Sequence, residues 1–250
     1  MSSNRKTKKI TGSGKAPVKK PKTVKAHKQP SGVQKHGKQW ENEIISVVVS
    51  PSNLEEAFSQ SHTAVHDIPR HLNKANPLVN VSIKATGSNR IDFGDAKRTI
   101  NNIEKQDSPL EAIVVSYSQS GNTKIPKNVM HIDLTNGRDK LLGLIPSSEL
   151  HARVERLDRM VKSGDPLYKN EVKELQKYMK QNGAALVVAP KIGNKEKGRS
   201  GRLQISLPNI RKFSEANPHL VVSDTSCKVY GKECLSVIES GKRTFNKQKI

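Results

Sequence analysis

Apolar residues follow two different spacings along this chain, and the spacings predict both strands and helices. Short β-branched or alternating runs predict strands over residues 43–49, 78–83, 112–117, 129–134, 184–189, 203–207 and 219–223. Apolar residues three or four positions apart predict short helices over residues 54–58, 95–106 and 210–216. Because strands and helices interleave, we expect an α/β or α+β domain with a mixed sheet.

The longest helical pattern lies in the middle of the chain, over about residues 147–182. Leu150, Val154 and Leu157 share one face of a first predicted helix, and a second follows over about residues 167–181. Gly164 stands where a helix ends, and a short Gly-Asp-Pro connection allows the two helices to fold back on each other. The sequence therefore predicts a central helical hairpin.

The positive charge is concentrated outside the predicted core. The chain has 250 residues, with 44 Lys and Arg against 23 Asp and Glu, which gives a formal charge of +21. Residues 1–39 hold twelve of these cations and no carboxylate, and they contain few large apolar side chains. Such a segment cannot bury enough apolar surface to offset the entropy of ordering. We therefore expect a disordered basic N-terminal arm over residues 1–39, followed by one mixed α/β domain over residues 40–240.

The predicted arm has the composition of a polyanion-binding segment, because clustered cations release the counterions that surround phosphates. A solubilising tail is the alternative interpretation. The arm cations that we expect to contact nucleic acid are Arg5, Lys6, Lys8, Lys9, Lys19, Lys20, Lys22, Lys25 and Lys28. The cluster near Lys19–Lys22 also has the composition of a nuclear import signal.

Two further basic segments add to this pattern. Residues 190–202 join two predicted strands and combine five cations with three glycines, so this loop could follow a phosphate backbone closely. Residues 241–250 form a basic C-terminal tail. The cations that we single out in the loop and the tail are Lys191, Lys195, Lys197, Arg199, Arg202, Lys242 and Arg243. Arg153, Arg156 and Arg159 recur on the first central helix as further candidates, with local ion pairing as the alternative.

No catalytic or metal-binding pattern stands out. His62, His66 and His71 are four and five residues apart, but Pro69 interrupts the segment, so surface histidines are the preferred interpretation. Cys227 and Cys234 match no zinc or redox spacing, and two cysteines fit a reducing compartment. We therefore expect no enzyme, no metal site and no cofactor.

One polar segment, Tyr117–Thr123, resembles the phosphate loop of flavodoxins, which holds the phosphate of a flavin. In that family a helix follows the loop at once. Here the next residues, Lys124-Ile125-Pro126, disfavour a helix. A polar turn at the end of a strand is therefore the interpretation that we prefer.

The three basic segments together predict a nucleic-acid-binding structural protein that contacts phosphates without reading sequence, with RNA favoured over DNA. The layout of a lysine-rich arm and a compact core is that of viral nucleocapsid, coat and movement proteins and of ribonucleoprotein components. One alternative is a matrix-like viral protein that binds an anionic membrane surface or an acidic protein. Another is a phosphate-handling enzyme with an unrecognised site.

The same observations bear on location and assembly. No run approaches the roughly 20 apolar residues that a membrane span needs, so we expect no transmembrane segment. We expect an intracellular protein, cytoplasmic or nuclear, or a virion component if the source is viral. A homo-oligomer is compatible with such a role.

Overall fold

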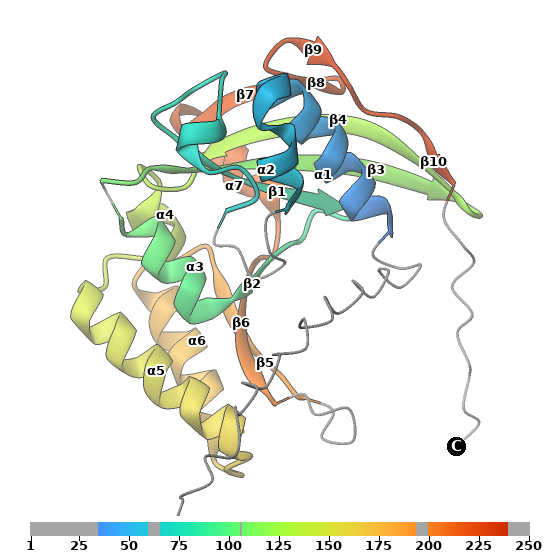
Figure 1. Ribbon diagram of the computed structural model, residues 1–250. Helices are drawn as coiled ribbons and strands as arrows, with labels where there is room; N and C mark the ends of the chain where they lie inside the picture. The colour runs from blue at the N-terminus through green and yellow to red at the C-terminus, as the bar shows by residue number, and fades with distance from the viewer. Residues whose placement is uncertain (1–34, 60–65, 106, 194–199, 240–250) are drawn as a thin grey trace, which may run out of the picture. The chain divides into compact units, whose positions relative to one another are not determined.

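The computed structural model describes residues 35–59, 66–105, 107–193 and 200–239 (Figure 1). In chain order its helices and strands are α1 (Lys35–Val48), α2 (Leu54–Ser59), β1 (Asn80–Thr86), β2 (Ile91–Asp95), α3 (Ala96–Ile103), β3 (Leu110–Ser120), β4 (Thr123–Asp133), α4 (Arg138–Leu142), α5 (Ser147–Ser163), α6 (Tyr168–Gln181), β5 (Val187–Lys191), β6 (Arg202–Leu207), α7 (Ile210–Ala216), β7 (Val221–Thr225), β8 (Lys228–Val229), β9 (Lys232–Glu233) and β10 (Ile238–Glu239). Short 3-10 turns occupy Pro51–Asn53, Arg70–Leu72 and Pro218–Leu220.

The strands form a large mixed sheet, a smaller sheet and a hairpin. In the large sheet β1 pairs with β3 in parallel, β3 pairs with β4 antiparallel, and β4 pairs with both β7 and β10. The smaller sheet is antiparallel with the order β2-β6-β5, and β8 and β9 pair separately. The expected mixed sheet is therefore confirmed, in an α+β arrangement.

The large sheet separates two hydrophobic cores (Figure 1). One core packs α1 and α2 against one face, and the other packs the opposite face with α3 to α7 and the smaller sheet. Strand β3 contributes to both, since Ile113 and Val115 belong to the first core and Ala112 and Val114 to the second. A strand buried on both faces has a continuous apolar run in its sequence, which explains why β3 was predicted correctly.

The predicted strand over residues 43–49 is wrong, because these residues lie in and just after helix α1. Trp40, Ile44, Ile45 and Val48 are buried at helical spacing against the large sheet. Short apolar runs do not distinguish a strand from a buried helix, and here packing of that stripe overrides the β preference of its branched side chains.

The helical hairpin is confirmed as α5 and α6, which turn at Gly164. Gly164 has a φ of 78°, and its amide donates to the Met160 carbonyl, so it ends α5 in the left-handed conformation that glycine favours. The predicted helices at 54–58, 95–106 and 210–216 correspond to α2, α3 and α7.

Several predicted boundaries differ from those observed. Helix α1 begins at Lys35, so the expected end of the arm at residue 39 falls inside a helix, and residues 1–34 lie outside the described residues. The turn predicted within Tyr117–Thr123 is confined to residues 121–122, because β3 continues to Ser120. The loop predicted over residues 190–202 is shorter, since both of its end segments pair in β5 and β6.

Candidate functional site

Most of the predicted phosphate-binding cations lie outside the described residues. These are the nine arm residues from Arg5 to Lys28, the loop residues Lys195, Lys197 and Arg199, and the tail residues Lys242 and Arg243. The two loop cations that are described, Lys191 and Arg202, lie directly opposite each other where β5 ends and β6 begins. Both side chains are exposed, so this end of the smaller sheet presents two adjacent positive charges.

The three arginines of α5 differ in their surroundings. Arg153 contacts Glu149 at 2.8 Å, and its guanidinium lies 4.1 Å from the centre of the Tyr178 ring on α6. Arg156 contacts Glu171 of α6 at 2.9 Å. Arg159 is exposed. Two of the three therefore join α5 to α6, and only the Arg153–Glu149 pair is local to α5, as the ion-pairing alternative expects.

The structure brings together charged residues that are far apart in the sequence, at the free edge of β1. Ile68 forms an isolated bridge with Val81, which places Asp67 beside the strand. One Asp67 carboxylate oxygen accepts hydrogen bonds from the Ile83 amide at 2.6 Å and the Ser82 hydroxyl at 3.2 Å. The Lys84 ammonium lies 3.5 Å from the same oxygen.

Helix α1 adds a second carboxylate to this edge. Glu41 pairs with Lys38 one turn earlier on the helix, and both side chains are partly buried. Burial raises the pKa of Glu41, and the nearby Asp67 charge raises it further, against the opposing effects of Lys38 and Lys84. We call Lys38, Glu41, Asp67 and Lys84 the β1-edge cluster.

The β1-edge cluster combines groups that acid–base chemistry uses. A carboxylate with a raised pKa exchanges protons closer to neutral pH, and a lysine ammonium stabilises negative charge that develops on a substrate oxygen. Sequence reasoning missed this cluster because residues 61–77 gave no prediction and residues 43–49 were assigned to a strand. No local spacing connects residues 41, 67 and 84.

The histidines and cysteines in the described part of the chain form no comparable site. His62 lies outside the described residues, and His71 contacts Glu56 at 3.1 Å on the surface. Burial lowers the pKa of His66, whose Nδ1 atom has no hydrogen-bond partner in the described structure. Among the described residues, no three His, Cys, Asp or Glu side chains are placed to hold a metal ion.

Cys227 and Cys234 are free thiols on either side of the β8–β9 hairpin. Burial raises the pKa of both, that of Cys234 to about 11. Because the thiolate is the reactive form, a raised pKa makes both cysteines less reactive than an exposed thiol.

A partly buried network of charged and polar side chains joins three helices. The Arg138 guanidinium donates to Glu104 and to the Gly143 and Ile145 carbonyls, and Ser147 and His151 also contact Glu104. Burial opposes ionisation of Glu104, but hydrogen bonds from Ser147, Arg138 and His151 outweigh it, so the pKa of Glu104 is lowered. The network therefore holds a charged carboxylate that joins α3, α4 and the start of α5.

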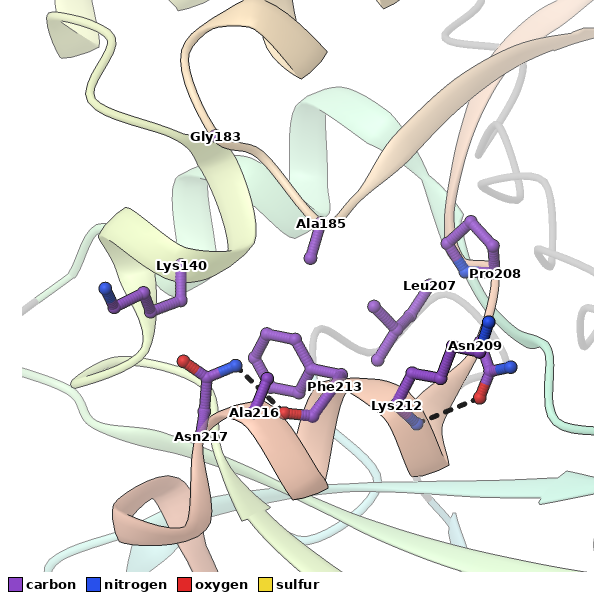
Figure 2. Close-up of a pocket in the computed structure, with 10 residues that line it drawn as sticks. All are labelled: Lys140, Gly183, Ala185, Leu207, Pro208, Asn209, Lys212, Phe213, Ala216 and Asn217. Carbon is purple, nitrogen blue, oxygen red and sulfur yellow. Dashed lines mark hydrogen bonds between the residues drawn. The ribbon is translucent and has the colours of Figure 1, made fainter.

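A separate cavity of about 340 Å³ opens between α4, α7 and the ends of α6 and β6 (Figure 2). Figure 2 shows Phe213 and Leu207 on its apolar wall. The Asn209 side chain accepts a hydrogen bond from the Lys212 backbone amide, and the Asn217 side chain donates one to the Phe213 carbonyl. Both side-chain amides are therefore used in hydrogen bonds at the ends of α7. Lys140 and Lys212 supply the remaining polar lining, and the cavity is at the small end of ligand sites.

Comparisons with known proteins add no assignment. No protein-family model matches the chain, and neither a curated protein nor a solved structure matches it significantly. None of the helices in the described part of the chain has the length and apolar character that crossing a bilayer requires. Function must therefore be argued from charge and geometry.

Proposed function

We propose that this protein binds nucleic acid through the phosphate backbone without reading sequence, with RNA favoured over DNA. The observation that carries the proposal is the charge distribution: a formal charge of +21, with an acid-free stretch over residues 1–39. Clustered cations release counterions from a polyphosphate, and this gain does not depend on base sequence. The exposed pair Lys191 and Arg202 supports the proposal within the folded part.

The aromatic content also favours backbone contact over base stacking. The chain contains one Trp, four Tyr and four Phe. Trp40 is fully buried and its ring lies 5.2 Å from that of Tyr117, inside the core under α1. Among the described aromatic residues Phe58 is exposed, but a stacking platform needs several such rings in succession, so the binding energy is expected to come from phosphate contacts.

Filter binding to a short labelled RNA across a salt series tests this proposal. We expect the logarithm of the affinity to fall linearly with the logarithm of salt concentration. A flat response between low and physiological salt would remove the electrostatic basis of the proposal. Deleting residues 1–34 should reduce the magnitude of the slope, and an unchanged slope would exclude these residues from binding.

A second candidate function is a phosphate-handling enzyme, and the β1-edge cluster favours it. Glu41 could accept the proton of a water that attacks phosphorus, while Lys84 faces the charge that develops on the phosphoryl oxygens. The reaction would hydrolyse a phosphodiester to an alcohol and a phosphate monoester.

Nuclease assays on labelled RNA and DNA, with Mg²⁺ and with a chelator, test this second candidate. The Glu41→Gln variant should abolish cleavage, while Glu55→Gln, which alters an exposed carboxylate on α2, should leave it unchanged. If the wild-type protein leaves every substrate intact, or if both variants cleave equally, the cluster has no catalytic role. A Lys84→Met variant checks the ammonium separately.

An anionic membrane surface remains the alternative partner for the same charges. Flotation with vesicles that contain or lack phosphatidylserine, after nuclease treatment, separates the two. Binding that requires the acidic lipid, in a protein that does not retain RNA, would favour the membrane alternative.

The same proposal includes an intracellular location, nuclear import through the residues near Lys19–Lys22, and self-association. Cell fractionation tests the location and the import, and light scattering tests self-association.

A further inference from the structure

Helix α6 uses two of its sides for packing inside the protein. Val172, Leu175 and Met179 are buried in the core beneath it. On one flank, Glu171 pairs with Arg156 of α5 and the Tyr178 ring receives the Arg153 guanidinium. The α5 flank therefore uses Glu171, one of the two acidic residues of α6, in an ion pair.

The opposite flank of α6 carries a row of lysines that sequence reasoning did not identify. They are spaced by four, four and three residues, so they lie on one side of the helix: Lys169, Lys173, Lys177 and Lys180. All four are exposed. The ion pairs found among the described residues involve none of the four.

The row runs beside the edge strand of the smaller sheet. Gln176 lies three residues after Lys173 and four before Lys180, so it shares their side of the helix. Its amide donates to the Val188 carbonyl of β5 at 2.6 Å, and Figure 1 shows α6 alongside β5. Further along the same strand, Lys191 faces Arg202 across the β5–β6 pair. Neither strand contains an acidic residue.

We propose that these six residues, which we call the basic flank (Lys169, Lys173, Lys177, Lys180, Lys191 and Arg202), bind the sugar-phosphate backbone of nucleic acid within the folded part of the protein. The inference rests on the proposed function and assigns a surface to it that does not depend on residues 1–34. Lysines four residues apart on a helix stand about 6 Å apart along its axis. A backbone that runs along the helix can therefore contact several ammonium groups in succession.

Two observations favour this role over an ordinary solvated helix face or a membrane surface. A solvated face usually mixes both signs of charge, whereas the lysine row itself contains no carboxylate. Glu171 is turned toward α5, and Glu174 is exposed beside the row, three residues before Lys177. A helix that lies on a bilayer inserts an apolar face. The apolar face of α6 is already buried in the core, so its lysines have no adjoining apolar stripe from the same helix to insert.

The test compares two full-length variants that each remove four positive charges. The first carries Lys169→Gln, Lys173→Gln, Lys177→Gln and Lys180→Gln. The matched control carries Lys74→Gln, Lys105→Gln, Lys127→Gln and Lys232→Gln, which alter exposed lysines outside α6, β5 and β6. Binding to a labelled single-stranded RNA is measured across a salt series, and circular dichroism checks folding.

We expect the first variant to lose about tenfold or more in affinity at low salt, and its salt slope to fall in magnitude by about 2–3, since each phosphate contact on a single strand contributes about 0.7. The control should change the slope by less than about 1. A double variant, Lys173→Gln with Lys177→Gln, should show about half the effect and provides the test if the quadruple variant unfolds.

The outcomes separate this inference from the proposed function. If the wild-type protein does not bind RNA even in dilute buffer, the proposed function fails and the inference fails with it. If the wild type binds and the two quadruple variants behave alike, only the basic flank is excluded. If the first variant retains RNA binding but loses binding to vesicles that contain phosphatidylserine, the flank contacts anionic lipid and the inference is overturned.

Discussion

His131 is a titratable side chain held in the neutral form inside the core under α1. It is 1% exposed, its ring lies 4.7 Å from that of Tyr230, and its Nε2 atom has no partner in the described structure. Burial lowers the pKa of His131 from 6.5 to about 4. Placing a positive charge at this position is therefore unfavourable in the folded protein.

This shift predicts a loss of stability in mild acid. Above pH 6.5 the histidine is neutral in both states, but between pH 6.5 and about 4 only the unfolded chain takes up the proton. The free energy of unfolding should therefore fall by up to about 3 kcal/mol across that range. His131→Phe should flatten this dependence in urea titrations, and the exposed His219→Gln should not.

Comparing the pH dependence of stability in wild type and His131→Phe separates the contribution of His131 from that of Glu111, which has the opposite sign. Glu111 is buried and accepts a hydrogen bond from Tyr230, and burial raises its pKa. A raised carboxyl pKa favours the folded state as the pH falls. If the two proteins lose stability in parallel from pH 7 to pH 4, His131 is not the group responsible.

At the level of single residues, sequence patterns identified core positions better than charged clusters. Leu150, Val154 and Leu157 were placed on one helix face from their spacing, and all three are buried. The β1-edge cluster could not be predicted in the same way, because α1 packing and an isolated bridge bring Glu41 and Asp67 close enough only for their charges to interact. Periodicity reports which side of an element is buried, not which distant elements meet.

Two glycines that end helices have similar backbone conformations but differ in how closely other atoms surround them. Gly143 follows α4 with a φ of 82°, and a Cβ there would lie 2.7 Å from the Asn182 carbonyl oxygen and 3.1 Å from the Ala184 amide. Gly164 has a similar φ of 78° after α5, but no atom lies within 4 Å of a Cβ there. The first position combines backbone strain with a clash, and the second has strain alone.

The two glycine-to-alanine variants should therefore differ in stability. Gly164→Ala should lower the free energy of unfolding by about 1–2 kcal/mol, the cost of a left-handed residue. Gly143→Ala should cost more, because its backbone conformation alone carries about 1–3 kcal/mol and the neighbouring backbone must also shift. If the two variants have equal urea midpoints, the backbone around Asn182 moves away from the added methyl group at little energetic cost.

Elements with local start and stop signals were predicted, and elements defined by distant partners were not. Gly164 and Pro166 mark the turn between α5 and α6 within a few residues. Strand β2 pairs with β6, which follows more than a hundred residues later in the sequence. Strand β10 has two residues, and both pair with β4. Short strands of this kind depend on an existing edge, which no local pattern reports.

At the scale of the whole molecule, both cores share strand β3 and should unfold together. Trp40 is the only tryptophan of the chain and lies in the core under α1. Ile100→Ala creates a cavity in the other core and should lower the free energy of unfolding by about 2–5 kcal/mol. Trp40 fluorescence should report the same shift as far-ultraviolet circular dichroism.

Separate transitions in those two signals would show that the two cores unfold independently. The comparison needs no assumption about residues 1–34, whose predicted phosphate contacts lie outside the described residues. Much of the positive charge on which the proposed function rests is therefore known from the amino-acid sequence alone. The fold adds the basic flank and the β1-edge cluster.

Residues near the two ends of the described chain contact each other. The Trp40 indole donates to the Ser236 carbonyl at 2.9 Å, the Ser236 amide donates to Glu43, and β10 lies next to β4 a few residues later (Figure 1). The positions at which the basic residues 1–34 and 240–250 join the described chain, Lys35 and Glu239, are each within a few residues of this contact. Under the proposed function, a polymer that bound both segments would be held at two points, so release from one segment would leave it bound to the other. Removing either segment should then shorten the lifetime of such a complex far more than it slows its formation.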